Sequence, residues 1–137
     1  MGANVRDAAC YVCWAFARAY EAAVMEPHVR ALAGGLVVMS VYDREVNCRR
    51  AASAAFQENV GRQGNYPNGI DIITTADYFT VSNVSRAYTE IAPTIFAFAE
   101  YQAPLLNHLL DDKVCARARV CSCVCTPQIL FVILFVD

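Results

Sequence analysis

The residues NVRDAA at positions 4–9 recur, with closely similar chemistry, as NCRRAA at positions 47–52. The two copies begin 43 residues apart, and a period of about 40–47 residues is typical of HEAT and armadillo repeats. Units of this kind are helical hairpins that stack side by side into a solenoid. The repeat therefore predicts an all-α, HEAT/armadillo-type α-solenoid fragment of about two repeats.

Each copy opens a stretch whose apolar residues have helical spacing. The apolar positions are Val5, Ala9, Val12 and Cys13 in the first copy and Cys48, Ala52, Ala55 and Phe56 in the second. Both sets follow the i, i+4, i+7, i+8 pattern that forms one face of an α-helix. We predict that both faces point into the core as the inner helices of two hairpins.

The segment between the copies predicts the outer helix of the first hairpin. Pro27 suits the first turn of a helix, and apolar residues recur at three- and four-residue steps from there to Val41. Gly34 and Gly35 fall in the middle, where each costs about 1 kcal/mol relative to alanine. A close helix crossing would offset that cost, and a local break is the alternative. Asp43 is predicted to cap the next helix.

The helical periodicity stops after the second copy. Glycine, proline and asparagine cluster between 61 and 69, which predicts a loop. Residues 70–79 are β-leaning in composition but also compatible with a short helix, and helical spacing returns near 85. We divide the chain into a repeat segment at 1–113, with a loop insertion at about 61–80, and a Cys-rich apolar tail at 114–137 that does not read as a native repeat.

Composition excludes two classes of function. The net charge is −2, and only Arg49 and Arg50 form a basic pair, so nucleic-acid binding is not expected. The longest apolar run, at 129–136, is far shorter than the roughly 20 residues of a spanning helix, so no membrane span is predicted. No secretory signal is visible, and the seven cysteines are interpreted as reduced thiols.

No catalytic, cofactor or metal site is expected from the residue spacing. Cys10 and Cys13 form a C-x-x-C inside a predicted helix, where buried thiols are the favoured interpretation. The remaining reactive groups are Cys115, Cys121, Cys123 and Cys125 of the tail, the isolated His28 and His108, and the adjacent Asp111 and Asp112. None of these has the spacing of a zinc site or an acid–base pair. A small thiol- or metal-dependent enzyme is the alternative.

The second inner helix carries the candidate partner-binding residues. Arg49, Ser53 and Gln57 are spaced i, i+4, i+8 on one face, and Arg50, Glu58 and Arg62 lie beside that stripe. Solenoids bind partners along extended helical surfaces. The alternative is that Arg49 bonds within its repeat and the other residues form a solvated face. The segment at 62–77 is a second candidate, because long insertions in repeats often carry function.

Two segments resemble the tubulin-folding cofactor D family: NVRDAACYVCWAFARAYE at 4–21 and DREVNCRRAASAAFQENVGRQGNYPNGIDIITTADYF at 43–79. The resemblance covers roughly 2–113. It implies a non-enzymatic α-solenoid chaperone that receives β-tubulin and works with tubulin cofactors C and E to assemble and dismantle the αβ-tubulin heterodimer. An Arf-like small GTPase is a further implied partner, and together with the other cofactors the family stimulates GTP hydrolysis by tubulin.

The resemblance also implies a location and leaves alternatives. The expected place is the cytoplasm and the microtubule cytoskeleton, with the centrosome and cell junctions as further family sites. Family members are far longer than this chain. A different HEAT scaffold, such as a transport or phosphatase-regulatory protein, and a truncated product without activity are the alternatives.

Overall fold

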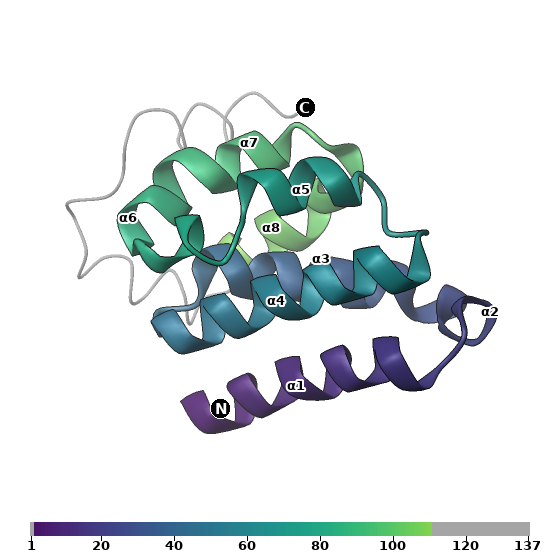
Figure 1. Ribbon diagram of the computed structural model, residues 1–137. Helices are drawn as coiled ribbons and strands as arrows, with labels where there is room; N and C mark the ends of the chain where they lie inside the picture. The colour runs from purple at the N-terminus through teal and green to yellow at the C-terminus, as the bar shows by residue number, and fades with distance from the viewer. Residues whose placement is uncertain (1, 111–137) are drawn as a thin grey trace.

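The computed structural model describes residues 2–110, and every regular element in that range is helical (Figure 1). The long helices are α1 (Ala3–Ala19), α3 (Val29–Tyr42), α4 (Val46–Gln63) and α8 (Ala99–Leu110). The short elements are α2 (Ala22–Met25), η1 (Glu26–His28), α5 (Gly69–Thr75), η2 (Thr80–Ser82), α6 (Val84–Arg86), the π-helical turn η3 (Ala87–Ile91) and α7 (Ala92–Phe96). The predicted all-α class is confirmed. The tail predicted at 114–137 lies outside the described residues.

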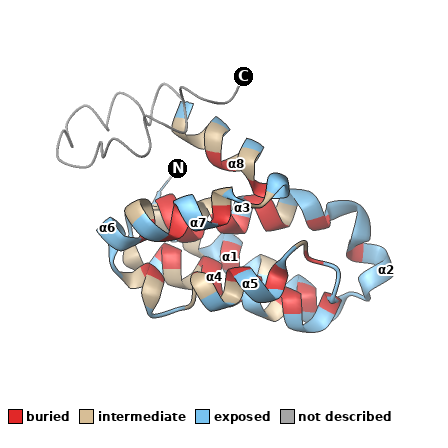
Figure 2. Cartoon of the chain, turned by 90° about the horizontal axis from the view of Figure 1, so that it is seen from above, coloured by how far each residue is buried: buried red, intermediate tan, exposed pale blue. Residues whose placement is uncertain are grey.

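Helix α4 occupies the middle of the molecule. It packs against α1 on one side and α3 on another, while α8 packs on α3 (Figure 1). Buried residues concentrate on α3 and α4, and α2 is largely exposed (Figure 2). The repeat partners α1 and α4 therefore lie side by side, as the inner helices of successive solenoid units do.

The predicted inward stripe holds for only one copy of the repeat. On α4 the residues Cys48, Ala52, Ala55 and Phe56 are all buried, as predicted. On α1 the prediction is wrong, because Val5 is 55% exposed, Val12 is 49% exposed and Ala9 is also exposed. The buried residues of α1 are Cys10 and Ala17. The difference arises because α1 covers one side of α4, whereas no described residue covers the corresponding side of α1.

Asp43 ends the outer helix and does not cap the next one. The predicted N-cap role is wrong, since α4 begins at Val46 with Glu45 in the capping position. The Asp43 carboxylate lies two residues before the cap, where it accepts from the backbone N–H of Glu45 at 2.9 Å and from Arg6, at 2.6 Å from Nε and 3.0 Å from Nη2. This bidentate pair ties the first repeat's arginine to the turn between α3 and α4, and its geometry is the strong form of an arginine–carboxylate contact.

The segment predicted as a loop is partly helical. Helix α4 continues to Gln63 and ends at Gly64, whose φ of +69° is the left-handed C-cap conformation that favours glycine. Residues 69–75 form helix α5, so the helical alternative applies to that stretch. At Gly69 a side chain would lie 2.7 Å from the Val60 side chain. The absence of a side chain at Gly69 thus lets α5 approach α4 closely.

The two central glycines of α3 lie in different environments, which gives a matched pair of substitutions. A Cβ atom at Gly34 would lie 2.9 Å from Cγ of Pro104 on α8, whereas one at Gly35 would meet no atom within 4 Å. We expect Gly34→Ala to lower the free energy of unfolding by about 1–2 kcal/mol, because overpacking outweighs the gain in helix propensity.

Gly35→Ala is the control, and it should raise the free energy of unfolding by about 0.5–1 kcal/mol. Urea unfolding followed by circular dichroism measures both values. Equal stabilisation by the two substitutions would contradict the close crossing of α3 and α8.

One helical stretch within the described residues could cross a membrane by length and composition alone. It runs over Ala22–Tyr42, which comprises α2, η1 and α3. Core helices of globular proteins meet the same criterion. Here α3 packs on α4 and α8, with Val37 and Val41 almost fully buried. The core thus accounts for part of its apolar character, since 33% of the apolar window is buried.

Candidate functional site

A groove runs between α1 and α4 on the exposed side of the inner helices. It has a volume of about 390 Å³. Its lining residues are Asp7, Tyr11, Trp14, Asn47, Arg50, Ala51, Ala54, Ala55 and Tyr78. The lining combines small alanines of α4 with aromatic side chains of α1 and of the segment after α5. This concave, partly apolar surface is the strongest candidate site in the described part of the chain.

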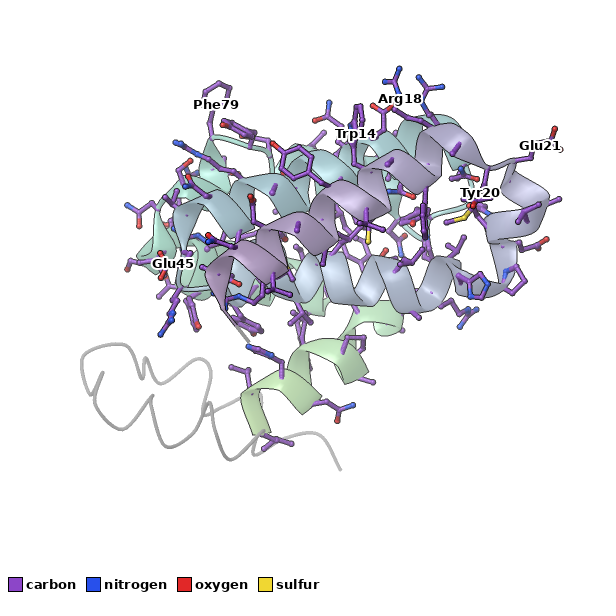
Figure 3. The ribbon with its side chains drawn as sticks, turned by 90° about the horizontal axis from the view of Figure 1, so that it is seen from below. Trp14, Arg18, Tyr20, Glu21, Glu45 and Phe79 are labelled. Atoms are coloured by element: carbon purple, nitrogen blue, oxygen red, sulfur yellow. The ribbon has the colours of Figure 1, made fainter. Side chains whose placement is uncertain are left out.

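Exposed aromatic side chains surround the groove. Tyr11 is 65% exposed and Trp14 is 37% exposed on α1, while Tyr78 is 43% and Phe79 is 80% exposed after α5. Trp14 and Phe79 project on the same side of the molecule (Figure 3). Tyrosine, tryptophan and phenylalanine are enriched in the cores of protein interfaces, because they bury a large area with little loss of side-chain entropy. The chemistry of the groove therefore suits a protein partner.

Arg50 supplies the cationic group of the groove. Its Nε atom donates to Oγ of Ser82 at 2.8 Å, and its guanidinium lies 5.0 Å from the centre of the Tyr78 ring. Both contacts fix the orientation of the side chain. Within residues 2–110 its terminal nitrogens have no hydrogen-bond partner, so they can donate to a carboxylate or a carbonyl of a bound molecule.

A charged cluster lies beside the groove. Glu58 accepts from Arg18 at 3.3 Å and also from Arg62, and Arg18 lies 4.7 Å above the Trp14 ring. The hydrogen bond from Arg62 is the main cause that holds the pKa of Glu58 below its usual range. The structure thus brings three of the predicted residues, Arg50, Glu58 and Arg62, to one surface. Gln57 is also exposed on α4.

Arg49 and Ser53 are not surface residues, so the predicted binding stripe is corrected at these two positions. Arg49 is only 2% exposed and Ser53 only 5%. The Ser53 hydroxyl donates to the carbonyl of Ala76 at 2.7 Å. Helix α5 and η2 fold back over this face of α4, and helical spacing within α4 carries no information about that cover. Arg49 forms bonds within the fold, which is the alternative raised by its repeat position.

The guanidinium of Arg49 binds four backbone carbonyls. Nε donates to Val81 at 2.6 Å, Nη2 to Ser82 at 2.8 Å, and Nη1 to Asp43 at 2.8 Å and Arg44 at 3.0 Å. Burial lowers the pKa of Arg49, and the charge of Asp43 opposes that shift. The side chain therefore joins the turn before α4 to the segment after α5, and through Ser82 it helps to position Arg50.

The described thiols are not placed for catalysis. Cys10 and Cys48 are buried and Cys13 is half-buried. Burial raises the pKa of Cys10 to about 12, so its thiol stays protonated at neutral pH. The Cys10 thiol lies 3.0 Å from the sulfur of Met39. Within residues 2–110, no group of three or more His, Cys, Asp or Glu residues could hold a metal ion. The tail cysteines lie outside the described residues.

The aromatic residues of the groove and two buried amides were missed from the sequence. Tyr11 and Trp14 lie off the predicted apolar stripe of their helix. Large aromatic residues outside that stripe were the signal in the sequence for an exposed binding surface. Asn59 is completely buried and Gln63 nearly so. Asn59 donates to the carbonyl of Cys13 at 3.2 Å, and Gln63 donates to those of Ala17 and Tyr20, each at 3.2 Å. These bonds hold α1 on α4.

Stacked repeat helices with an aromatic groove along the inner helices define this chain as an armadillo/HEAT-type repeat protein. The family model described as "Tubulin-specific chaperone D-like, ARM repeats" matches residues 1–70. The chain belongs to the tubulin-specific chaperone D-like family.

Two curated relatives with similar sequences carry names that match this family. Tubulin-specific chaperone D of Dictyostelium discoideum is 48% identical over 116 residues, covering 83% of this chain and 8% of the relative. Tubulin-folding cofactor D of Schizosaccharomyces pombe is 31% identical over 111 residues, covering 81% of this chain and 10% of the relative. The chain thus spans about a tenth of each relative's length. No solved structure matches it.

Proposed function

We propose that this chain acts as a segment of a tubulin-folding chaperone and that the α1–α4 groove contacts β-tubulin. The names of the two relatives support the tubulin-folding role. The observation that carries the contact is the set of exposed aromatic side chains around Arg50. Aromatic and arginine side chains contribute most of the binding energy at protein interfaces.

The wider roles of the family extend this proposal to the whole solenoid. They are assembly and disassembly of the αβ-tubulin heterodimer with tubulin cofactors C and E, stimulation of tubulin's GTP hydrolysis, and interaction with an Arf-like small GTPase. The segment contributes binding surface and no catalytic group to these roles. Its place of action is the cytoplasm, at the microtubule cytoskeleton, with the centrosome and cell junctions as further locations.

Capture of β-tubulin by the purified 137-residue chain tests the groove. We expect the parent chain to retain β-tubulin and Trp14→Ala to weaken capture by about tenfold or more, because an anchoring aromatic side chain is lost. Arg50→Glu should weaken capture similarly, because it replaces the cationic group of the groove with an anionic one. The amount retained at a series of chain concentrations gives the apparent affinity.

The control variant is Arg86→Glu. Arg86 is exposed on α6, where it pairs with Glu90 at 2.9 Å, and it is not among the groove-lining residues. Its capture should equal that of the parent, and circular dichroism should show parental helicity for all variants. Failure of the helical parent chain to retain β-tubulin, or retention by Trp14→Ala and Arg50→Glu at the parental level, would rule out the groove as the contact.

A further inference from the structure

The turn between α5 and η2 holds an aromatic side chain out in solvent. Phe79 is 80% exposed, more than any other large apolar residue within residues 2–110. Its ring makes an edge-to-face contact with Tyr78 at 5.5 Å between centroids, and Tyr78 lines the α1–α4 groove. Figure 3 shows Phe79 projecting on the same side as Trp14. Because removing an exposed aromatic ring from water is strongly favourable, Phe79 can contribute much to an interface.

Hydrogen bonds fix the turn in this conformation. The carboxylate of Asp77 accepts from the backbone N–H groups of Phe79 at 2.6 Å and of Thr80 at 2.9 Å. The Thr80 hydroxyl lies 3.1 Å from the carbonyl oxygens of Thr75 and Asp77, to either of which it can donate. An aspartate that accepts from N–H groups two and three residues further on closes a tight turn. The backbone of the turn therefore directs Phe79 away from the core.

The base of the turn is anchored on α4 at both ends. The Ser53 hydroxyl donates to the carbonyl of Ala76 before the turn, and Arg49 donates to the carbonyl of Val81 after it. Ser53 and Arg49 are both buried. These two residues, which helical spacing placed on the binding surface, thus hold the segment that carries Phe79.

A fixed turn beside a cation defines the surface that it can meet. An aromatic side chain that is already held in place loses little conformational entropy on binding. The guanidinium of Arg50 lies 5.0 Å from the centre of the Tyr78 ring, and within residues 2–110 its terminal nitrogens have no hydrogen-bond partner. The matching surface therefore has an apolar pocket for one aromatic ring and a carboxylate or carbonyl beside it.

We propose that Phe79 is an anchor residue that inserts into an apolar pocket of β-tubulin, and that Asp77 is the residue that positions it. This inference rests on the proposed function, because it takes β-tubulin as the partner, and it extends the contact beyond the residues that line the groove. The contact then combines a projecting ring with a concave groove. A partner without the matching pocket would clash with the ring, so Phe79 determines specificity as well as affinity.

Capture of β-tubulin by variants of the 137-residue chain tests the anchor. Phe79→Ala should weaken the apparent affinity by about tenfold or more, with the thermal unfolding midpoint of the parent, because the side chain is exposed. Val24→Ala is the control, since Val24 is 57% exposed on α2. Figure 3 places Phe79 and Glu21, which directly precedes α2, at opposite ends of the molecule. Val24→Ala should leave capture unchanged.

Two substitutions of Asp77 separate its positioning role from its charge. Asp77→Asn keeps an oxygen that can accept from both N–H groups, so it should retain the parental affinity. Asp77→Ala removes that oxygen and frees the turn, and it should weaken capture by about three- to tenfold although Phe79 is still present. Parental affinity for Asp77→Ala, or an equal loss for both variants, contradicts the positioning role.

Hydroxyl-radical footprinting of the unmodified chain gives a measurement that no substitution can disturb. Phe79 should be oxidised in the free chain and should lose most of that oxidation when β-tubulin is bound. Phe16 is 42% exposed and is not among the groove-lining residues, so it should react equally in both states. Tyr101, which is 1% exposed, should stay protected in both and so report intact folding.

The outcomes distinguish this inference from the proposed function. Weaker capture by Trp14→Ala together with parental affinity for Phe79→Ala, or with unchanged oxidation of Phe79 in the complex, would overturn the anchor and leave the groove contact in place. A helical parent chain that retains no β-tubulin would overturn both. Protection of Phe79 in the free chain that disappears on dilution would assign the ring to a second copy of the chain and would also overturn the anchor.

Discussion

Replacing Arg49 with alanine is expected to lower the free energy of unfolding by about 3–5 kcal/mol, because four backbone carbonyls lose hydrogen bonds from a charged donor. The side chain is 2% exposed and binds four backbone carbonyls. Truncation removes the guanidinium from all four carbonyls, of which that of Val81 is in a buried hydrogen bond. Since small domains are stabilised by only about 5–15 kcal/mol, this loss removes a large share of the stability of the chain.

The neighbouring arginine is the matched control for this prediction. Arg50 is only half-buried, and within residues 2–110 its one hydrogen bond is to the Ser82 hydroxyl. Arg50→Ala should therefore cost less than about 1 kcal/mol. Urea unfolding of both variants, followed by far-UV circular dichroism, gives the comparison. Similar losses at the two positions would mean that the four carbonyl bonds contribute little to stability.

Asn59→Ala is the second substitution with a large expected effect, a loss of about 2–4 kcal/mol from hydrogen bonds and a new cavity. Asn59 is 0% exposed. Its amide nitrogen donates to the carbonyls of Cys13 at 3.2 Å and Ala55 at 2.8 Å, and its oxygen accepts from the Tyr66 hydroxyl at 2.9 Å. The residue thereby joins α1, α4 and the turn before α5, and its loss should loosen all three.

A double-mutant cycle with Tyr66→Phe separates the parts of this network. Burial raises the pKa of Tyr66 to about 12, so its hydroxyl is protonated and can donate at neutral pH. Tyr66→Phe removes only the hydroxyl, with an expected loss of about 1–2 kcal/mol. The two losses should not add in the double variant, because both remove the same bond. Strict additivity would show that the Asn59–Tyr66 bond does not form in solution.

The sequence by itself determined the helical class, the 43-residue repeat and the family. The apolar spacing of α4 also predicted its buried face correctly, because residues three and four positions apart lie on the same face of a helix. The same spacing on α1 did not predict burial. A periodic stripe shows that a helix is built to be covered on that side, but it does not show whether the covering element is present.

Only the tertiary structure decided the roles of Arg49, Ser53 and Asn59. All three are polar residues of α4, a helix whose polar positions predict contact with solvent. All three are buried by segments distant in the chain. Arg49 is covered by the residues after α5, and Asn59 by α1 and Tyr66. The groove likewise depends on tertiary packing, because α1, α4 and Tyr78 come from separate parts of the sequence. Helix periodicity is a local property, whereas burial and hydrogen bonding of a polar side chain depend on which distant backbone packs against it.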